Sequence, residues 1–261
     1  MFILFFIFQY NIIFRKKDYI IPFIMKKQIQ NNIISCLYIV PTPIGNMQDI
    51  TFRAVNVLKD VDIIACEDTR RTGLLLKLLN ISATNRLKSY FDHNEETKSI
   101  EIINEIKKGK SVALISDAGT PCISDPGYKL VKIANENNIK IISLPGATAF
   151  IPALVASGLA THNFTFFGFP PQKKGRQTFL KNIINSENTI ILYESSHRIL
   201  KLINEIAELD NDRNIFISRE LTKIFEEHIS FNTSQFINNE IKINDKGEFV
   251  LIIEGKLKNK K

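Results

Sequence analysis

Asp117 and Asp125 flank two Gly/Pro turns in the most informative stretch of this chain, SDAGTPCISDPG at residues 116–127. Glycine lets a backbone approach a ligand closely, and proline fixes the turns. The sequence has neither of the glycine patterns that cradle phosphates, and its acids do not alternate as they do in a calcium loop. Backbone amides and carbonyls beside the apolar Ile123 instead favour a neutral or zwitterionic ligand that carries a flat ring.

Three more loops rich in Gly, Pro or Asp each follow a strand-like apolar run: PTPIGN at 41–46, CEDTRR at 66–71 and LPGAT at 144–148. Stretches whose apolar residues have helical spacing lie between these runs. This alternation of strands and helices predicts an α/β fold with a mainly parallel, helix-covered sheet. Ligands of such sheets bind outside the carboxyl ends of the strands. Turns of α/β proteins are often rich in these residues without binding anything, but four such loops at one edge favour a binding site.

The small and polar residues of SGLATHN (157–163) are typical of a domain boundary. We therefore expect an N-terminal α/β domain at 33–158, which carries the four loops, and a C-terminal α/β domain at 159–256. Residues 1–32 are expected to lie outside the fold, and residues 257–261 to form a basic tail.

The N-terminal run MFILFFIFQYNIIF is interrupted by polar residues and falls short of the roughly 20 apolar residues of a membrane span. It also lacks the features of a signal peptide. Because Met25 begins a stretch typical of a natural start, we interpret residues 1–24 as an added extension without stable membrane association. A weak membrane-surface anchor is the alternative.

The net charge of +7 is located at the two ends of the chain. Residues 1–32 and 256–261 each contribute +4, and the body between them carries −1. Bulk charge therefore gives little support for a polyanionic partner. Cys36, Cys66 and Cys122 form neither a metal-ligand pattern nor a paired disulfide framework, which predicts a reducing, cytoplasmic location and no metal site.

Seven motifs, in order and spacing, match a known family over residues 35–255: VPTPIGNMQDIT, EDTR, SDAGTPCISDPG, PGAT, YESSHR, RELTK and KGEFVL. The sequence resembles the tetrapyrrole-methylase-like (class III) S-adenosylmethionine-dependent methyltransferases. Within them it is most similar to the branch that methylates the ribose 2′-hydroxyl of cytidine 1402 in 16S rRNA. Ser196 stands where this branch is expected to have proline, and the apolar extension is foreign to it.

The resemblance implies two α/β domains of the tetrapyrrole methylase type, with S-adenosylmethionine in the cleft between them, and a homodimer. It also implies the residues that bind the cofactor, with Tyr193 closing the cleft from the second domain. The expected contacts are Ile44, Gly45, Asp117, Ala118, Gly119, Ile123, Ser124, Thr148, Ala149 and Tyr193.

A ribose 2′-hydroxyl is a weak acid and benefits from a general base. Glu67 and Asp68 of EDTR are the candidates, although Asp68 would also serve well as a helix cap. Cations on three loops are expected to contact RNA phosphates, with solvated surface charge as the alternative. They are Arg70, Arg71, Lys173, Lys174, Arg176 and Arg198.

Three functions follow from this sequence. The first is ribose methylation of 16S rRNA, presented free or in the 30S subunit. The second is a tetrapyrrole or other small-molecule methyltransferase of the same fold, which VPTPIGN disfavours because tetrapyrrole enzymes resemble G-x-G-P-G-D at that turn. The third is a non-catalytic RNA-binding relative that retains the cofactor loops.

Overall fold

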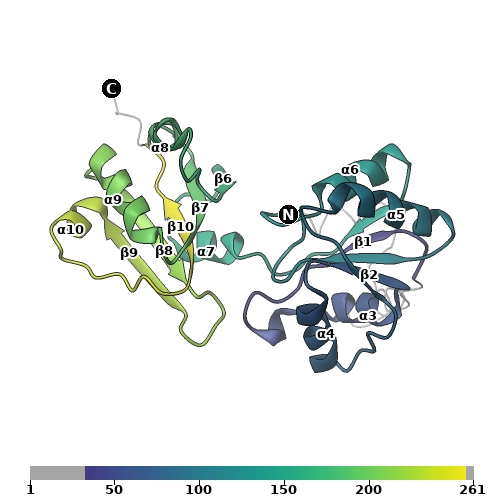
Figure 1. Cartoon of the computed structure of the whole chain (residues 1–261). Coiled ribbons are helices and arrows are strands. Elements are labelled where there is room, and N and C mark those ends of the chain that lie inside the picture. The colour runs from purple at the N-terminus through teal and green to yellow at the C-terminus, as the bar shows by residue number, and fades with distance from the viewer. Residues whose placement is uncertain (1–32, 257–261) are drawn as a thin grey trace, which may run out of the picture. The chain divides into compact units, whose positions relative to one another are not determined.

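The computed structural model describes residues 33–256, so the expectations for residues 1–32 and 257–261 lie outside the described residues. Residues 35–256 belong to one compact unit, Ser35–Lys261. Within the described range the strands of this unit form two five-stranded sheets, each covered by helices (Figure 1).

The first sheet is wholly parallel, in the order β3-β2-β4-β1-β5. Its strands are β1 (Leu37–Ile39), β2 (Ile63–Cys66), β3 (Leu87–Ser89), β4 (Val112–Ile115) and β5 (Ile141–Ser143). The connecting helices are η2 (Met47–Asp49), α3 (Phe52–Asp60), α4 (Thr69–Leu78), α5 (Glu95–Lys107) and α6 (Tyr128–Glu136). The predicted parallel sheet is confirmed, whereas β3 was not predicted.

Helices cover both faces of this sheet, with α3 and α4 on one side and α5 and α6 on the other (Figure 1). Strands β2 and β4 are therefore buried at every position, which explains why they are continuous apolar runs without alternation. Leu37 and Leu114 pack with Ile102 and Ile103 of α5 in the core of one face. This packing fixes the strand ends from which the predicted loops leave.

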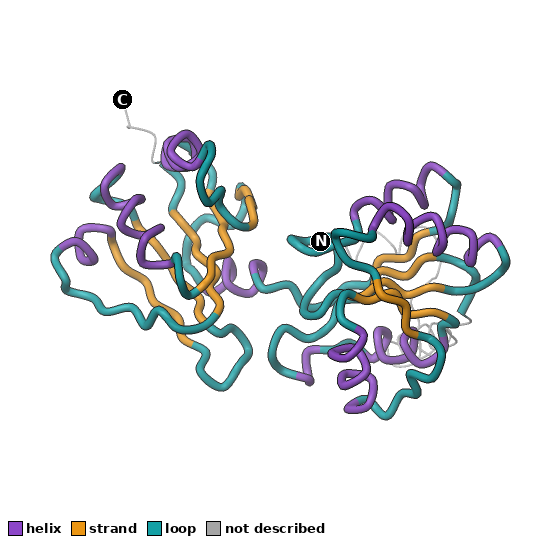
Figure 2. The backbone as a smooth tube through the Cα atoms, viewed as in Figure 1, coloured by secondary structure: helices purple, strands orange, loops and turns teal. Residues whose placement is uncertain are grey.

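The second sheet is mixed, in the order β6-β7-β10-β8-β9, and only the β6–β7 pair is parallel. Its strands are β6 (Phe164–Gly168), β7 (Thr189–Ser195), β8 (Asn214–Arg219), β9 (Glu227–Asn232) and β10 (Glu248–Ile253). The helices of this half are α7 (Phe150–Ala156), α8 (Arg176–Ile184), α9 (Ile199–Leu209) and α10 (Thr233–Ile237) (Figure 2).

Helix α7 packs on the second sheet rather than the first. Its Ala153 and Leu154 form a buried cluster with Ile191, Phe216 and Val250 of β7, β8 and β10. The chain therefore passes from one half to the other before α7, earlier than the boundary predicted at 157–163. The small residues of that stretch end α7 and form a turn, in which Gly158 has a φ of 70°.

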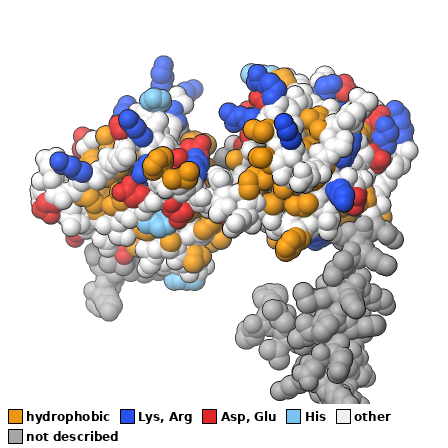
Figure 3. All heavy atoms as spheres, turned by 90° about the horizontal axis from the view of Figure 1, so that it is seen from below, with side chains coloured by type: hydrophobic (Ala, Val, Ile, Leu, Met, Phe, Trp, Pro, Cys, Tyr) orange, Lys and Arg blue, Asp and Glu red, His pale blue; other side chains and the backbone are white. Residues whose placement is uncertain are grey.

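Basic and acidic side chains are interspersed on the face seen in Figure 3, consistent with the nearly neutral body of the chain. Within residues 33–256, no helix combines the length and the apolar character needed to cross a bilayer.

Candidate active site

The strand-end loops of the first sheet are hydrogen-bonded to one another. Thr42 and Gly119 exchange two backbone hydrogen bonds of 2.8 and 3.0 Å, which joins the loop after β1 to the loop after β4. The Thr120 hydroxyl donates to the Ala147 carbonyl oxygen at 2.8 Å and lies 2.6 Å from the Thr148 hydroxyl, which adds the loop after β5. Three of the four predicted loops are joined in this way, and the Asp68 amide, which donates to Asp117 at 3.2 Å, joins the fourth loop to them.

The loop at 116–127 has an unusual backbone that a buried carboxylate holds in place. Besides Gly119 at 87°, Cys122 and Ser124 have φ values of 72° and 61°, a left-handed conformation that costs non-glycine residues about 1–2 kcal/mol each. Glu95 Oε1 accepts a hydrogen bond of 2.7 Å from the Gly127 amide and one of 3.2 Å from the Tyr90 hydroxyl. Glu95 thus anchors the end of the loop.

The second sheet supplies the facing wall. Tyr193, Val250 and Ser218 are opposite one another on β7, β10 and β8, so they share one face of the sheet. The rings of Phe166 and Phe169 lie 5.0 and 5.7 Å from that of Tyr193 and brace it edge-on.

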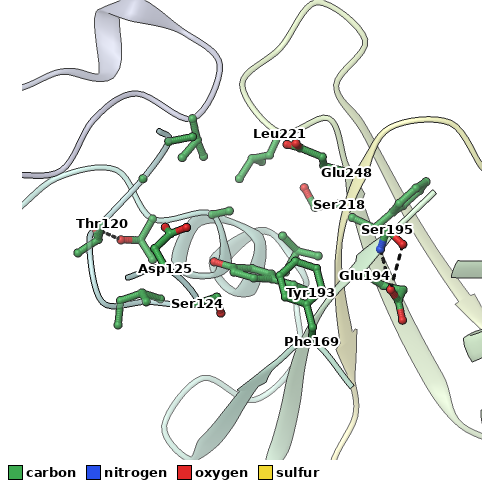
Figure 4. A pocket seen from close by; sticks show the side chains of 18 of the residues that line it. Thr120, Ser124, Asp125, Phe169, Tyr193, Glu194, Ser195, Ser218, Leu221 and Glu248 are labelled. Carbon is green, nitrogen blue, oxygen red and sulfur yellow. Dashed lines mark hydrogen bonds between the residues drawn. The ribbon is translucent and has the colours of Figure 1, made fainter. Parts of the chain in front are cut away.

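Between these elements lies a cavity of about 350 Å³, within the usual range of small-molecule sites (Figure 4). Eight of the ten expected cofactor contacts line it: Ile44, Ala118, Gly119, Ile123, Ser124, Thr148, Ala149 and Tyr193. The sequence did not assign the other lining groups, among them Thr120, Asp125, Phe169, Ser218 and Leu221.

Gly45 and Asp117 do not line this cavity. A Cβ atom on Gly45 would lie 2.6 Å from Lys223 Cγ and 2.7 Å from Thr222 Oγ1, so this glycine permits a close approach between loops. The Asp117 carboxylate accepts hydrogen bonds from the Asp68 amide at 3.2 Å and from the Arg71 guanidinium at 3.0 Å. Both residues support the site from outside.

Of the two acids in the loop at 116–127, Asp117 and Asp125, it is Asp125 that lines the cavity. Partial burial, together with the negative charges of Glu67, Asp117 and Asp92, raises its pKa to about 7, against a lowering by a hydrogen bond from Ser116. Burial likewise raises the pKa of Tyr193 to about 12. Near neutral pH the cavity therefore holds a neutral phenol and a carboxyl that can either hold or release a proton.

A second, more open cavity of about 590 Å³ lies at the end of β2. Glu67, Asp68, Arg70, Arg71 and Asp117 line it. Asp68 caps α4, because its Oδ1 accepts a hydrogen bond of 2.8 Å from the Arg70 amide, and the Arg70 guanidinium pairs with its Oδ2 at 2.9 Å. These bonds lower the pKa of Asp68 to about 2. Asp68 is therefore a helix cap, the alternative role expected from the sequence, and its low pKa makes it a weak base.

Of the expected phosphate contacts, Arg176 is placed differently from the prediction. It is buried, and its guanidinium binds both carboxylate oxygens of Glu205 on α9, at 3.1 and 2.9 Å. Lys173 and Lys174 of the same loop are exposed. Arg198 donates to Glu194 Oε1 at 2.8 Å. Arg176 is therefore a structural cation, because its charge is already neutralised inside the fold.

Comparisons with known proteins agree with this fold. Residues 36–236 match the family model described as Tetrapyrrole (Corrin/Porphyrin) Methylases. The chain is 48% identical to the ribosomal RNA small subunit methyltransferase I of Hydrogenobaculum sp. (strain Y04AAS1), over 83% of this chain and 94% of the relative. The protein of the same name from Buchnera aphidicola subsp. Acyrthosiphon pisum is 49% identical, over 87% of this chain and 82% of that relative.

Solved structures share the fold at low sequence identity. The uroporphyrin-III-C-methyltransferase of Thermus thermophilus superposes with a TM-score of 0.58 at 17% identity, over 84% of this chain and 93% of that one. A structure of the Thermus thermophilus uroporphyrin-III C-methyltransferase with S-adenosyl homocysteine superposes with a TM-score of 0.55 at 16% sequence identity, over 84% of this chain and 97% of that one.

Two α/β halves around a cavity of strand-end loops define an S-adenosylmethionine-dependent methyltransferase, as predicted. The chain belongs to the tetrapyrrole methylase family and, within it, to the ribosomal RNA small subunit methyltransferase I group. The predicted family and cofactor are therefore confirmed.

The residues present fit that cofactor. Apolar side chains such as Ile44, Ile123 and Leu221 can cover a flat ring, while backbone groups of the loops offer hydrogen bonds. The Ser218 hydroxyl is fully buried at the cavity wall and has no hydrogen-bond partner among the described residues. A buried hydroxyl of this kind is costly unless a ligand satisfies it.

Proposed function

We propose that this chain transfers the methyl group of S-adenosylmethionine to a ribose 2′-hydroxyl of small-subunit rRNA, at cytidine 1402 of 16S rRNA. One observation carries the proposal. Relatives named for small-subunit rRNA methylation are nearly half identical over more than four fifths of this chain.

S-adenosylmethionine supplies an electrophilic methyl group on a sulfonium, and this chain positions that methyl group for transfer. The rigid, mutually hydrogen-bonded loops that carry Gly119 and Thr148 are proposed to hold the cofactor, and Tyr193 to close over it. Fixing the methyl carbon in line with the attacking oxygen is worth up to about 7–11 kcal/mol in favourable cases. A polar second cavity, with the exposed Arg70 and Arg71 at its wall, is the proposed entry for the RNA backbone.

The proposal is tested by label transfer. The protein is incubated with S-adenosylmethionine radiolabelled in the methyl group and with 30S subunits, naked 16S rRNA or uroporphyrinogen. We expect label on the ribose of one cytidine of the rRNA, and none with a Gly119→Val control. Label on both RNA substrates or on only one of them tells whether the assembled subunit is required.

A tetrapyrrole methyltransferase is the second candidate, because the solved structures with this fold include uroporphyrin-III methyltransferases. Their identity of 16–17% to this chain supports a shared fold alone. Label on uroporphyrinogen and none on rRNA would favour this candidate. Cofactor binding without label on any acceptor would favour the non-catalytic RNA-binding alternative.

We also propose that the protein is a homodimer that acts where ribosomal subunits reside, which is the cytoplasm of bacteria. Phe52, Ile224 and Phe225 are large apolar side chains with exposed fractions of 91%, 95% and 70%, and a second copy of the chain would shield such groups. Sedimentation equilibrium at micromolar concentration tests the dimer: a single monomeric mass would exclude it.

A further inference from the structure

Among the described residues, Asp125 differs from the other acids that line the main cavity in having no cationic partner. Glu194 accepts a hydrogen bond from Arg198 at 2.8 Å, and Glu248 pairs with Lys223 at 2.8 Å. Among residues 33–256, no basic side chain forms an ion pair with Asp125, although its carboxylate lines the same cavity. A partly buried carboxylate without a cation is unfavourable, so a site that retains one has a use for it.

The surroundings of Asp125 keep its proton affinity high. Figure 4 shows its side chain on the loop that carries Thr120 and Ser124, pointing into the cavity toward the Tyr193 hydroxyl. The charges that face it are those of Glu67, Asp117 and Asp92, which follow β2, β4 and β3, and all three are negative. Together with burial, they raise the pKa of Asp125 to about 7.

We propose that the Asp125 carboxylate is the general base that removes the proton of the ribose 2′-hydroxyl, an inference that rests on the proposed function. As the 2′-oxygen forms its bond to the methyl carbon, the carbon–sulfur bond breaks and its electron pair stays on sulfur. The hydroxyl proton passes to an Asp125 oxygen and from there to water. Atoms and charge balance without any further reactant.

The two acids of EDTR are less suited to this step. Asp68 has a pKa of about 2 and is occupied by the α4 cap and by Arg70. Glu67 lines the second cavity and not the one that fits the cofactor. A base works best when its pKa lies near the operating pH, a condition that Asp125 meets within the cavity itself.

The test compares the full chain with Asp125→Asn, Glu67→Gln and Asp92→Asn under single-turnover conditions, with saturating cofactor and the RNA substrate, from about pH 6 to pH 8. Asp92 lines neither described cavity and is exposed, so its variant removes a charge that raises the pKa of both Asp125 and Glu67 and leaves both cavity linings unchanged. Cofactor affinity is measured in parallel by calorimetry, and folding by circular dichroism.

We expect the wild-type rate to rise with pH through a midpoint near pH 7 toward a plateau at higher pH, because only the ionised base accepts a proton. Asp125→Asn should bind cofactor normally but react at least about 10²-fold more slowly and without this pH dependence. Asp92→Asn should keep the plateau and move the midpoint to lower pH. Because Asp92→Asn leaves the loop intact, a lower midpoint in this variant, together with a retained rate in Glu67→Gln, tests the inference even if Asp125→Asn is poorly folded.

Three results would overturn the inference while the proposed function stands. The first is an undiminished rate in Asp125→Asn. The second is a loss of cofactor affinity in that variant that accounts for its loss of rate, since the carboxylate would then pair with the cofactor's ammonium group. The third is a rate abolished in Glu67→Gln alone. Absence of rRNA methylation by the wild-type chain would instead refute the proposed function, and the inference with it.

Discussion

Replacing Arg176 by Ala should destabilise the protein strongly, although Arg176, at the start of α8, directly follows a loop whose cations Lys173 and Lys174 are exposed. Its side chain is 7% exposed and that of Glu205 is 15% exposed, and the guanidinium also donates to the Pro171 carbonyl oxygen at 2.9 Å. Removing one partner of a buried pair leaves an uncompensated charge, at a cost of about 3–5 kcal/mol. For a chain of this size that corresponds to a melting temperature lower by about 6–20 °C.

The assay is thermal unfolding followed by circular dichroism, with the Arg176→Met/Glu205→Leu double variant as the rescue. Replacing both partners by apolar side chains of similar volume should recover most of the loss, because no charge is then left buried without a partner. A decrease of less than about 1 kcal/mol in the free energy of unfolding of Arg176→Ala would refute the reasoning, because an exposed ion pair contributes that much to stability.

Lys173 and Lys174 provide the matched control. Because both are exposed, changing them to Ala should leave the melting temperature unchanged. If both contact phosphates, the same double variant should reduce the slope of log affinity against log salt by about 0.7–0.9 for each lost contact. A reduced slope in Arg176→Met/Glu205→Leu and none in the lysine variant would reverse the two assignments.

Two further predictions concern cofactor binding. Gly119→Val should abolish cofactor binding while circular dichroism stays unchanged, because the φ of 87° and the 3.3 Å approach to Ile44 leave no room for a β-branched side chain. Gly175→Val, strained at a φ of 81° but not among the residues that line the cavity, is the control and should bind normally. Calorimetry in excess chelator should give undiminished affinity for S-adenosylmethionine, since the contacts proposed for it need no cation, and a requirement for added metal would contradict this.

The parallel sheet and its loops could be predicted from the sequence because both depend on local pattern and topology. Apolar runs such as 63–66 and 112–115 are buried on both faces, so their composition alone identifies them. Parallel connections then bring every strand end to one edge, whichever order the strands take. Strand β3, with the sequence LKS and only half-buried, has no such composition and is formed by pairing with β2.

The rest depends on partners that lie far apart in the chain. Arg176 looked like part of a basic loop, since its partner Glu205 follows 29 residues later on another helix. The apolar face of α7 did not indicate which sheet it covers. Asp125 stood out in its motif, but its raised pKa comes first from burial and then from acids such as Glu67 and Asp92 at the ends of other strands, and only the folded structure supplies both.

Substitution of Glu95 tests whether a residue outside the cavity sets the geometry of the loop at 116–127. Its buried Oε1 accepts from the Gly127 amide and the Tyr90 hydroxyl, so Glu95→Leu leaves the Gly127 amide without an acceptor, whereas the Tyr90 hydroxyl can still donate to Ser99 Oγ at 3.2 Å. A buried unsatisfied amide costs about 1–3 kcal/mol, and the end of the loop is freed as well. We expect lower stability together with weaker cofactor binding by the folded protein. Glu96→Leu, at the exposed neighbouring position, should change neither quantity. Normal affinity in Glu95→Leu would mean that the strained turns at Cys122 and Ser124 persist without this anchor.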